Sequence, residues 1–341
     1  MTDADLIVVG AGPAGLGTAI YAAQAGLSVV VLEARPTPID KACGEGLMPG
    51  AVRALAEIDV RPDGRPFRGI RYTDGRRHVD AVFRRGSGLG VRRTVLQAAL
   101  VDRARAAGVT VADGRVAEAR CAGSRVVVDG RSARYLAVAD GLHSALRRQL
   151  GLDRPPGRIR PRWGVRQHFA VPAWTDLVEV HWAAHSEAYV TPVGDELVGV
   201  AVLSSRQAPF ATQLEDFPAL RARLGAEVAT GPRGAGPLRQ RASARVSGRA
   251  LLVGDAAGYV DALTGEGIAV SLACARRLVD CVLADEPERY EHAWAVASRR
   301  YRTITTALLW ARRRRLLASR IVPAAVRLPS VFGAAVQELA R

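Results

Sequence analysis

Aromatic residues are scarce in this chain, and lysine is almost absent. Aromatics make up 5% of the 341 residues, and Lys41 is the only lysine although lysine and arginine together number 48. The formal net charge of +15 is therefore carried by arginines that are spread from end to end. A nucleic-acid-binding protein concentrates its positive charge on one element and interleaves it with aromatics. The sequence predicts instead an arginine-rich, solvated surface, and no nucleic-acid partner is expected.

Cysteine and long apolar runs are also in short supply, which limits where the protein is expected to reside. Cys43, Cys121, Cys274 and Cys281 show neither a C-x-x-C motif nor the framework of a secreted disulfide scaffold. No apolar run reaches the length of a membrane span, and the glycine-rich turn after Leu6 begins too early for a signal peptide. We expect a cytoplasmic protein without a metal site or an integral membrane segment.

The chain does contain a glycine-rich turn close to its N-terminus. The apolar stretch 6–9 leads into Gly10, Gly12 and Gly15 in the spacing G-x-G-x-x-G, and a second apolar stretch ends at Glu33. Strand, turn, helix and acid-tipped strand form the dinucleotide-binding fingerprint. Gly12 lets backbone N–H groups approach a pyrophosphate, whose charge the helix N-terminus favours. Glu33 is placed to accept hydrogen bonds from a ribose 2′-hydroxyl.

Two later stretches repeat the pattern of an apolar strand that ends in glycine and aspartate. The stretch 136–139 runs into Asp-Gly at 140–141, and the stretch 249–253 runs into Gly-Asp at 254–255. Both are followed by helical patterns, so both resemble turns that face a ligand. No second full-length G-x-G-x-x-G unit is present, and a resident nicotinamide nucleotide is therefore not expected.

The segment 40–50 combines residue types that rarely occur together. It holds the only lysine, Lys41, with Cys43 and Glu45 close behind, and its glycines let the backbone approach a flat ligand. We interpret it as a loop that lies against the reactive end of a cofactor, because such loops carry function on rigid scaffolds. The alternative is a surface loop before a helix at 51–57. Cys43 is a candidate proton donor or a packing residue, and both readings stay open.

Strand-like patterns are concentrated in two separate parts of the chain. Alternation and an Asp-Gly turn predict a hairpin at 67–87, and four further strands are expected within 163–203. These strands could wall off a pocket, for which His181, Tyr189 and Pro192 are candidates. The expected fold is α/β, a FAD/NAD(P)-binding Rossmann-like domain with an inserted β-sheet substrate domain and a C-terminal helical region. The predicted boundaries are 1–66, 88–158 and 240–285 for the dinucleotide-binding domain, 67–87 and 159–239 for the β-rich substrate domain, and 286–341 for the helical region.

The C-terminal region has a basic, helical pattern. Four consecutive arginines at 312–315 are flanked by the apolar stretches 308–310 and 316–317. An amphipathic basic helix can dock on an anionic membrane surface, whereas a solvated arginine face would cover the core. Peripheral membrane contact through these helices is therefore left open, as is the oligomeric state.

Three motifs together resemble those of a known superfamily. The G-x-G-x-x-G turn at 10–15, the A-D-G-x-x-S-x-L-R segment at 139–147 and the G-D-A-A segment at 254–257 resemble the FAD-binding motifs of the aromatic-hydroxylase superfamily, the group A flavin monooxygenases. Within it, C-G-E-G at 43–46 and the stretch 254–268 look most like the geranylgeranyl reductase branch. The resemblance covers about four-fifths of the chain, and three motifs in order are far more specific than one.

The resemblance implies one tightly held FAD and assigns individual residues to it. Lys41, Cys43 and Glu45 are the candidate catalytic residues. Electrons would arrive through transiently bound NAD(P)H or from a separate reductase. The residues implied in FAD binding are Gly10, Gly12, Ala14, Gly15, Glu33, Arg35, Cys43, Gly44, Gly46, Arg93, Val116, Asp140, Gly141, Gly254, Asp255, Gly265, Gly267 and Ile268.

Three functions are consistent with these observations. The first is an FAD-dependent monooxygenase that uses O₂ to hydroxylate or epoxidise an apolar aromatic, polyketide or isoprenoid molecule of secondary metabolism. The second is a flavin-dependent reductase of C=C bonds in a prenyl substrate of the geranylgeranyl type. The third, more distant, is a non-catalytic flavin-binding or basic scaffold protein. Halogenation is less expected, because the tryptophan-bearing signature and the lysine motif of flavin-dependent halogenases are not evident.

Overall fold

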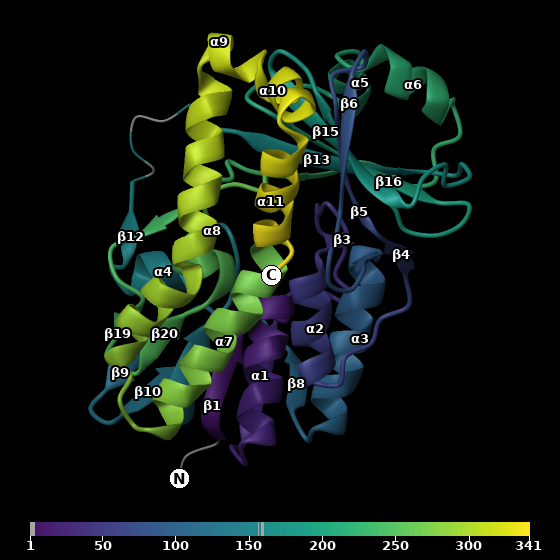
Figure 1. Ribbon diagram of the computed structural model, residues 1–341. Helices are drawn as coiled ribbons and strands as arrows, with labels where there is room; N and C mark the ends of the chain where they lie inside the picture. The colour runs from purple at the N-terminus through teal and green to yellow at the C-terminus, as the bar shows by residue number, and fades with distance from the viewer. Residues whose placement is uncertain (1–3, 156, 158–159) are drawn as a thin grey trace.

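The computed structural model describes residues 4–155, 157 and 160–341 (Figure 1). Its eight-stranded sheet is built around the apolar run at the N-terminus, which pairs in parallel with a neighbour on either side. Strands paired in this way are buried on both faces, which explains their continuous apolar sequences. In spatial order the strands are β19 (Val246–Ser247), β20 (Ala250–Leu252), β11 (Arg131–Val138), β1 (Ala4–Val9), β2 (Val29–Glu33) and β8 (Thr110–Asp113), with β10 (Arg125–Val128) and β9 (Ala119–Ala122) attached to β11.

Helices from distant parts of the sequence pack together beside this sheet (Figure 1). α1 contacts both α3 and α7, and its buried face consists of small and aliphatic residues such as Ala19 and Ile20. The late helix α7 thereby brings the 254–267 stretch next to the first turn of the chain. The helices of this layer and the short elements near them are α1 (Pro13–Gln24), α2 (Pro49–Glu57), α3 (Arg93–Ala106), α4 (Ala145–Gln149), the 3₁₀ helix η1 (Gly254–Ala257) and α7 (Gly267–Leu283).

The seven-stranded sheet forms the second body of the molecule. The predicted 67–87 hairpin is present as β5 and β6, and β5 pairs in parallel with β14 from the later β-rich stretch. The two stretches therefore share one sheet, as expected. Its strands in spatial order are β17 (Arg233–Ala235), β13 (Trp163–Phe169), β16 (Val198–Ser204), β15 (Ser186–Pro192), β14 (Leu177–Trp182), β5 (Gly69–Thr73) and β6 (His78–Val82), and the helices α5 (Phe210–Leu214) and α6 (Pro218–Leu224) follow β16.

Two small sheets connect these bodies. One contains β3 (Gly46–Leu47), β7 (Gly88–Gly90) and β4 (Arg65–Phe67), and the other contains β12 (Asp153–Arg154) and β18 (Arg241–Ala242). The first of them fixes the end of the 40–46 loop, because β3 is its continuation. The sequence analysis did not anticipate this sheet, since runs of two or three residues carry no periodicity.

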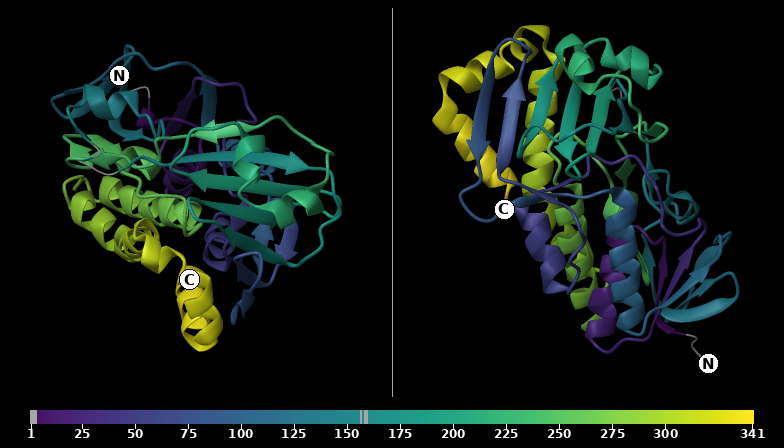
Figure 2. Two further views of the ribbon diagram at one scale, coloured as in Figure 1. Left: turned by 90° about the horizontal axis from the view of Figure 1, so that it is seen from above. Right: turned by 90° about the vertical axis from the view of Figure 1, so that its right-hand side faces the viewer.

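The C-terminal helices span both bodies. α8 (Arg289–Arg313) packs on α7 and continues past the seven-stranded sheet, where α9 (Arg315–Ala318), α10 (Ile321–Arg327) and α11 (Pro329–Leu339) turn back along β5 and β6 (Figures 1 and 2). The chain ends beside α2, where the Gly50 N–H donates to the Ala340 carbonyl oxygen at 3.0 Å. Within the described residues, none of the helices combines the length and the apolar character that a membrane crossing requires.

Candidate functional site

The turn between β1 and α1 packs directly against the end of β11. Gly10 has a φ of +107°, and a Cβ at this position would overlap the carbonyl oxygen of Ala139. α1 begins at Pro13 without a side-chain cap, which leaves its first N–H groups for another acceptor. Glu33, 4% exposed, accepts the backbone N–H of Ala11 at 2.8 Å. This arrangement presents backbone donors to a pyrophosphate.

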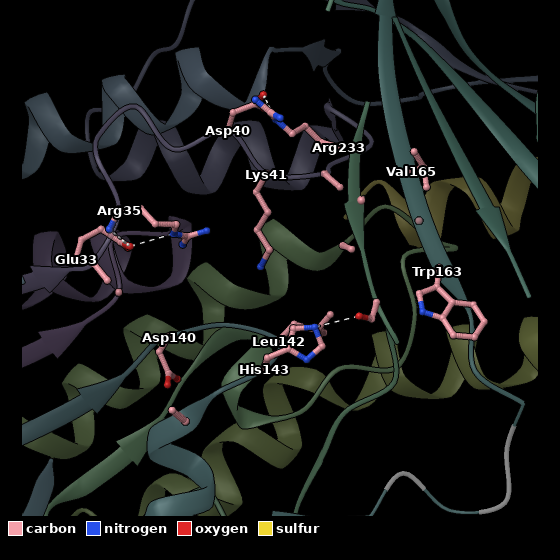
Figure 3. A pocket seen from close by; sticks show the side chains of 18 of the residues that line it. Glu33, Arg35, Asp40, Lys41, Asp140, Leu142, His143, Trp163, Val165 and Arg233 are labelled. Carbon is pink, nitrogen blue, oxygen red and sulfur yellow. Dashed lines mark hydrogen bonds and ion pairs between the residues drawn. The ribbon is translucent and has the colours of Figure 1, made fainter. Parts of the chain in front are cut away.

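A cleft of about 1010 Å³ begins at this turn (Figure 3). Glu33 and Arg35, an ion pair of 3.1 Å, lie on one side of it, and Trp163 of β13 lies on the other. Lys41 extends between them (Figure 3), and Val116 also lines the cleft. The cleft therefore separates the expected nucleotide-binding residues from the inserted sheet.

A second cavity of about 270 Å³ adjoins the cleft and shares Lys41 and Asp140 with it. Its polar part brings together five stretches of chain that are far apart in the sequence. Gly254 lies beside it with a φ of +64°, where a Cβ would stand 2.6 Å from the Ala14 Cβ. The expected FAD residues that line this part are Gly12, Ala14, Cys43, Gly44, Gly46, Arg93, Gly141, Asp255, Gly265, Gly267 and Ile268.

Two buried polar atoms at this site lack partners among the described residues. They are Nη1 of Arg93 and Oδ1 of Asp140. Arg93 is 7% exposed, and burial lowers the pKa of its guanidinium despite the opposing charges of Cys43 and Asp255. Oδ2 of Asp140 accepts the backbone N–H of Leu146 at 3.2 Å, which leaves Oδ1 free. Buried polar atoms without partners are costly unless a ligand pairs with them. The donor and acceptor set therefore fits a polyhydroxylated, phosphate-bearing cofactor such as FAD.

Beyond the polar part, the second cavity becomes apolar. We call this part the apolar chamber. Its walls come from β5, from the strands β14, β15 and β16, from the small sheet of β3, β7 and β4, and from the C-terminal helix α11. The residues that define it are Met48, Phe67, Ile70, Tyr72, Val178, Val180, Tyr189, Ala201, Leu203, Leu238, Leu263 and Leu339.

Comparison with known proteins agrees with this geometry. Residues 3–284 match the family described as FAD binding domain. The menaquinone reductase of Mycolicibacterium smegmatis is 30% identical over 328 residues, which cover 86% of this chain and 80% of that protein.

This chain is an FAD-dependent oxidoreductase of the FAD binding domain family. It is also 29% identical, over 85% of each chain, to digeranylgeranylglycerophospholipid reductase 1 of Methanopyrus kandleri. The crystal structure of a flavoprotein/dehydrogenase from Cytophaga hutchinsonii shares its fold, with a TM-score of 0.82 and 18% identity over 98% of this chain and 92% of that one. The resemblance found in the sequence is thus confirmed at the level of fold, family and cofactor.

In this oxidoreductase Cys43 lines the second cavity, to which both the polar part and the apolar chamber belong. Its Sγ accepts the backbone N–H of Glu45 at 3.4 Å. Burial raises the pKa of the Cys43 thiol, although the nearby Arg93 guanidinium opposes the shift. The sulfur is therefore a protonated thiol at neutral pH, and its catalytic role stays a prediction.

Glu45, the second candidate catalytic residue, is committed to other protein groups. It is 3% exposed and takes a φ of +59°, a conformation unusual for a side chain other than glycine. Oε1 accepts the backbone N–H of Arg93 at 2.8 Å, and Oε2 lies 2.6 Å from Nε2 of His168 on β13. Glu45 fastens the 40–46 loop to the inserted sheet. This geometry does not support its expected role as a free acid beside the cofactor.

Lys41, the third candidate, crosses the cofactor cleft. Its Nζ lies 3.5 Å from Oδ2 of Asp255, and it also approaches Gly141. The lysine thus stands between two of the expected FAD-binding segments. Its position suits a cation that neutralises a phosphate or steers Asp255 better than one that transfers a proton to a substrate.

Two of the three predicted pocket residues lie elsewhere. His181 points to the face of β14 opposite Val178 and Val180, where its Nε2 is 3.0 Å from Oε2 of Glu179. Side chains alternate along a strand, so His181 cannot share the chamber with Val180. Pro192 is buried at the end of β15 against Gly90 and is not part of the lining. Both assignments are corrected, whereas Tyr189 does line the chamber.

The sequence analysis missed several residues of the site. Thr191 donates its hydroxyl to the Gly44 carbonyl oxygen at 2.8 Å and so fixes the loop from the other side. Asp261 and Tyr259 line the cavity, and Leu339 closes it. Of these residues, only Asp261 could have been suspected from the sequence, because it lies shortly after the Gly-Asp turn at 254–255. Leu339 was invisible because nothing local places the last helix over the chamber.

Proposed function

We propose that this oxidoreductase reduces a C=C bond in the prenyl chain of a lipid. The observation that carries the proposal is the apolar chamber, which shares a cavity with Cys43 and is lined by hydrocarbon and aromatic side chains. Such a chamber suits a hydrocarbon segment. Support also comes from the relatives, which are named for menaquinone and for digeranylgeranylglycerophospholipid, both of which carry isoprenoid chains. The sequence analysis places the monooxygenase first and the C=C reductase second, and this proposal reverses that order.

The residues of the polar part would hold FAD along the length of the cleft. The start of α1 and Lys41 would face the phosphates, Glu33 the adenosine ribose, and Asp255 the ribityl chain. Arg93 would place its unpartnered Nη1 toward the cofactor. When bound and reduced, FAD supplies a hydride for the substrate carbon.

Cys43 would supply the proton for the other carbon of the double bond. Cys43 lines the same cavity as the chamber, and its raised pKa keeps the proton on sulfur at neutral pH. Addition of one hydride and this proton saturates the bond, and the thiolate left behind regains a proton from solvent through the cleft. The apolar walls exclude water from the reacting segment.

The experiment that tests the proposal uses the FAD-loaded protein and two probes, geranylgeraniol and a menaquinone. The cofactor is reduced with dithionite without O₂, the probe is added, and the product is followed by mass spectrometry. We expect a gain of two hydrogens per double bond reduced. A gain of one oxygen after admission of air, without a gain of hydrogen, would replace this proposal with the monooxygenase. No mass change with either probe would contradict both assignments of substrate class.

A matched pair of variants addresses the proton donor. Cys43→Ala removes the proposed donor, whereas Cys121→Ala removes an exposed thiol outside the cavity. We expect Cys43→Ala to lower the turnover of the reduced protein about 100-fold, within the range for general acid catalysis. Cys121→Ala should leave it unchanged. Equal turnover in both variants would leave Cys43 as a packing residue.

A further inference from the structure

The end of the molecule formed by the C-terminal helices has an uncovered apolar surface. Leu328 is 55% exposed and Val331 60%, and Leu317 and Val326 are also exposed. Trp310, near the end of α8, is 55% exposed. We call this set, with Arg314, Arg320 and Arg327, the C-terminal surface. Figure 1 shows α9 and α10 at the end of the molecule away from β9 and β10, and α11 running from there toward the middle of the molecule.

α11 has a buried apolar face and an exposed apolar residue at the start of its outer side. Its inner residues Phe332, Val336 and Leu339 are buried in one cluster with Tyr72, and the Phe332 and Tyr72 rings lie 4.7 Å apart. Its outer side begins at the exposed Val331, continues through small residues and ends at Glu338. Large apolar side chains on the outer side of a helix are stabilised by contact with protein or with lipid. The outer side of α11 is therefore expected to have an apolar partner.

The charged side chains of the C-terminal stretch are positive, except for Glu338 near the end of α11, which pairs with Arg341. Between 292 and 337 the sequence contains no aspartate or glutamate. Among the described residues, Arg314, Arg320 and Arg327 form no ion pair with a carboxylate. The arginines of this stretch are Arg299, Arg300, Arg302, Arg312, Arg313, Arg314, Arg315, Arg320 and Arg327.

We propose that the C-terminal surface docks on an anionic lipid bilayer. Leu328 and Val331 would enter the boundary between head groups and acyl chains, and Arg320 and Arg327 would pair with lipid phosphates. A second copy of this chain is a poorer partner, because a symmetric contact would bring two arginine-rich surfaces together. The helices would lie in the membrane surface without crossing it.

Docking on a bilayer would also affect how a lipid substrate reaches the apolar chamber. The same helix α11 that carries the outer Val331 closes the apolar chamber with Leu339. A lipid could then reach the chamber from the bilayer without crossing water. This part rests on the proposed function, whereas the docking itself holds whichever reaction the protein performs.

Co-sedimentation with vesicles tests the docking without any measurement of turnover. The FAD-loaded protein is mixed with vesicles of phosphatidylcholine alone or with phosphatidylglycerol at one-third of the lipid. We expect binding to the anionic vesicles that weakens with salt, and little binding to the neutral ones. Arg320→Glu/Arg327→Glu should weaken binding by about 25-fold or more, because each arginine near such a surface contributes about fivefold. Leu328→Asp/Val331→Asp should weaken it by at least about tenfold.

Matched variants at other exposed positions test whether binding depends on the C-terminal surface itself or only on the net charge and exposed apolar area of the protein. Arg125→Glu/Arg131→Glu reverses two exposed charges on β10 and β11, and Val228→Asp/Leu283→Asp changes two exposed apolar residues. Both should bind like the unaltered protein. Equal binding by all four variants would overturn the proposal. So would a dimer, seen by sedimentation velocity, that Leu328→Asp/Val331→Asp dissociates while vesicles bind nothing.

Discussion

Asp40 is a partly exposed carboxylate in the cleft, Asp261 is a buried carboxylate in the second cavity, and the same two effects act on them with opposite results. Burial is the largest effect on both and raises the pKa. At Asp40, hydrogen bonds from Arg166 and Arg233 outweigh burial, and its pKa lies below the ordinary value. At Asp261 burial prevails and raises the pKa to about 6, although Arg162 Nη1 is 3.6 Å away.

The difference lies in direct hydrogen bonding and exposure. The Asp40 side chain is 26% exposed and is held by two guanidinium groups, whereas that of Asp261 is 4% exposed and has no guanidinium donor. A guanidinium that lies a few ångströms away lowers the pKa of a carboxyl less than one that donates a hydrogen bond to it. The comparison also separates two clusters. A loop cluster, Asp40, Glu45, Arg166 and His168, holds the 40–46 loop, and a helix cluster, Arg162, Glu187, Asp261 and Arg312, holds α8.

The largest expected effect breaks the helix cluster. Glu187 is fully buried and pairs with both Arg162 and Arg312. Glu187→Ala leaves two desolvated cations without their carboxylate, so we expect it to lower the free energy of unfolding by about 3–5 kcal/mol. Urea unfolding measures this loss. Glu196→Ala, at an exposed position, should stay within about 0.5 kcal/mol of the parent, and a similarly small loss at Glu187 would show that α8 does not depend on this cluster.

The next effect concerns the pH dependence of Asp261. Its pKa is raised from 3.8 to about 6 in the folded state, so the protonated carboxyl is the form that folding favours. The stabilisation is complete below pH 4 and is lost as the pH rises through 6. Between these values, the free energy of unfolding of the parent relative to Asp261→Asn should fall by about 3 kcal/mol. Urea unfolding of both proteins from pH 4 to pH 8 measures this difference. A difference that stays constant over this range would contradict the prediction.

How much of this was readable from the sequence depends on how local the cause is. Gly10 and Glu33 were predictable because a tight turn and the tip of a strand act within one βαβ unit. The family motifs placed Asp255 and Gly267 at the same cofactor. His181 failed because alternation gives two faces to β14 but does not say which one meets the chamber. His168 and Leu339 were not foreseen, since each reaches the site through tertiary packing over more than 100 residues of sequence.

A smaller effect is expected at the loop cluster, where the measured quantity is the affinity for FAD and not the stability of the fold. Glu45→Gln keeps the shape of the side chain but removes the charge that faces His168 Nε2 at 2.6 Å. The 40–46 loop should loosen, and the dissociation constant for FAD should rise about tenfold, equivalent to about 1.4 kcal/mol. Flavin fluorescence titration measures it. Glu118→Gln, on an exposed loop, is the control. Unaltered affinity together with lower stability would make the loop cluster a structural contact only.

The smallest effect is the reverse pH dependence at Asp40. Because its pKa is lowered on folding, its ionised form is favoured, and the stabilisation is present above the ordinary pKa of 3.8 and lost in acid. The stability of the parent relative to Asp40→Asn should therefore rise with pH from below 3.8 toward neutrality, opposite to Asp261. We expect a smaller amplitude, because the side chain is partly exposed and water screens its two guanidinium partners. The same urea titration, extended to pH 3, measures both slopes. Equal slopes at the two positions would mean that burial, and not the donated hydrogen bond, decides the charge of both carboxylates.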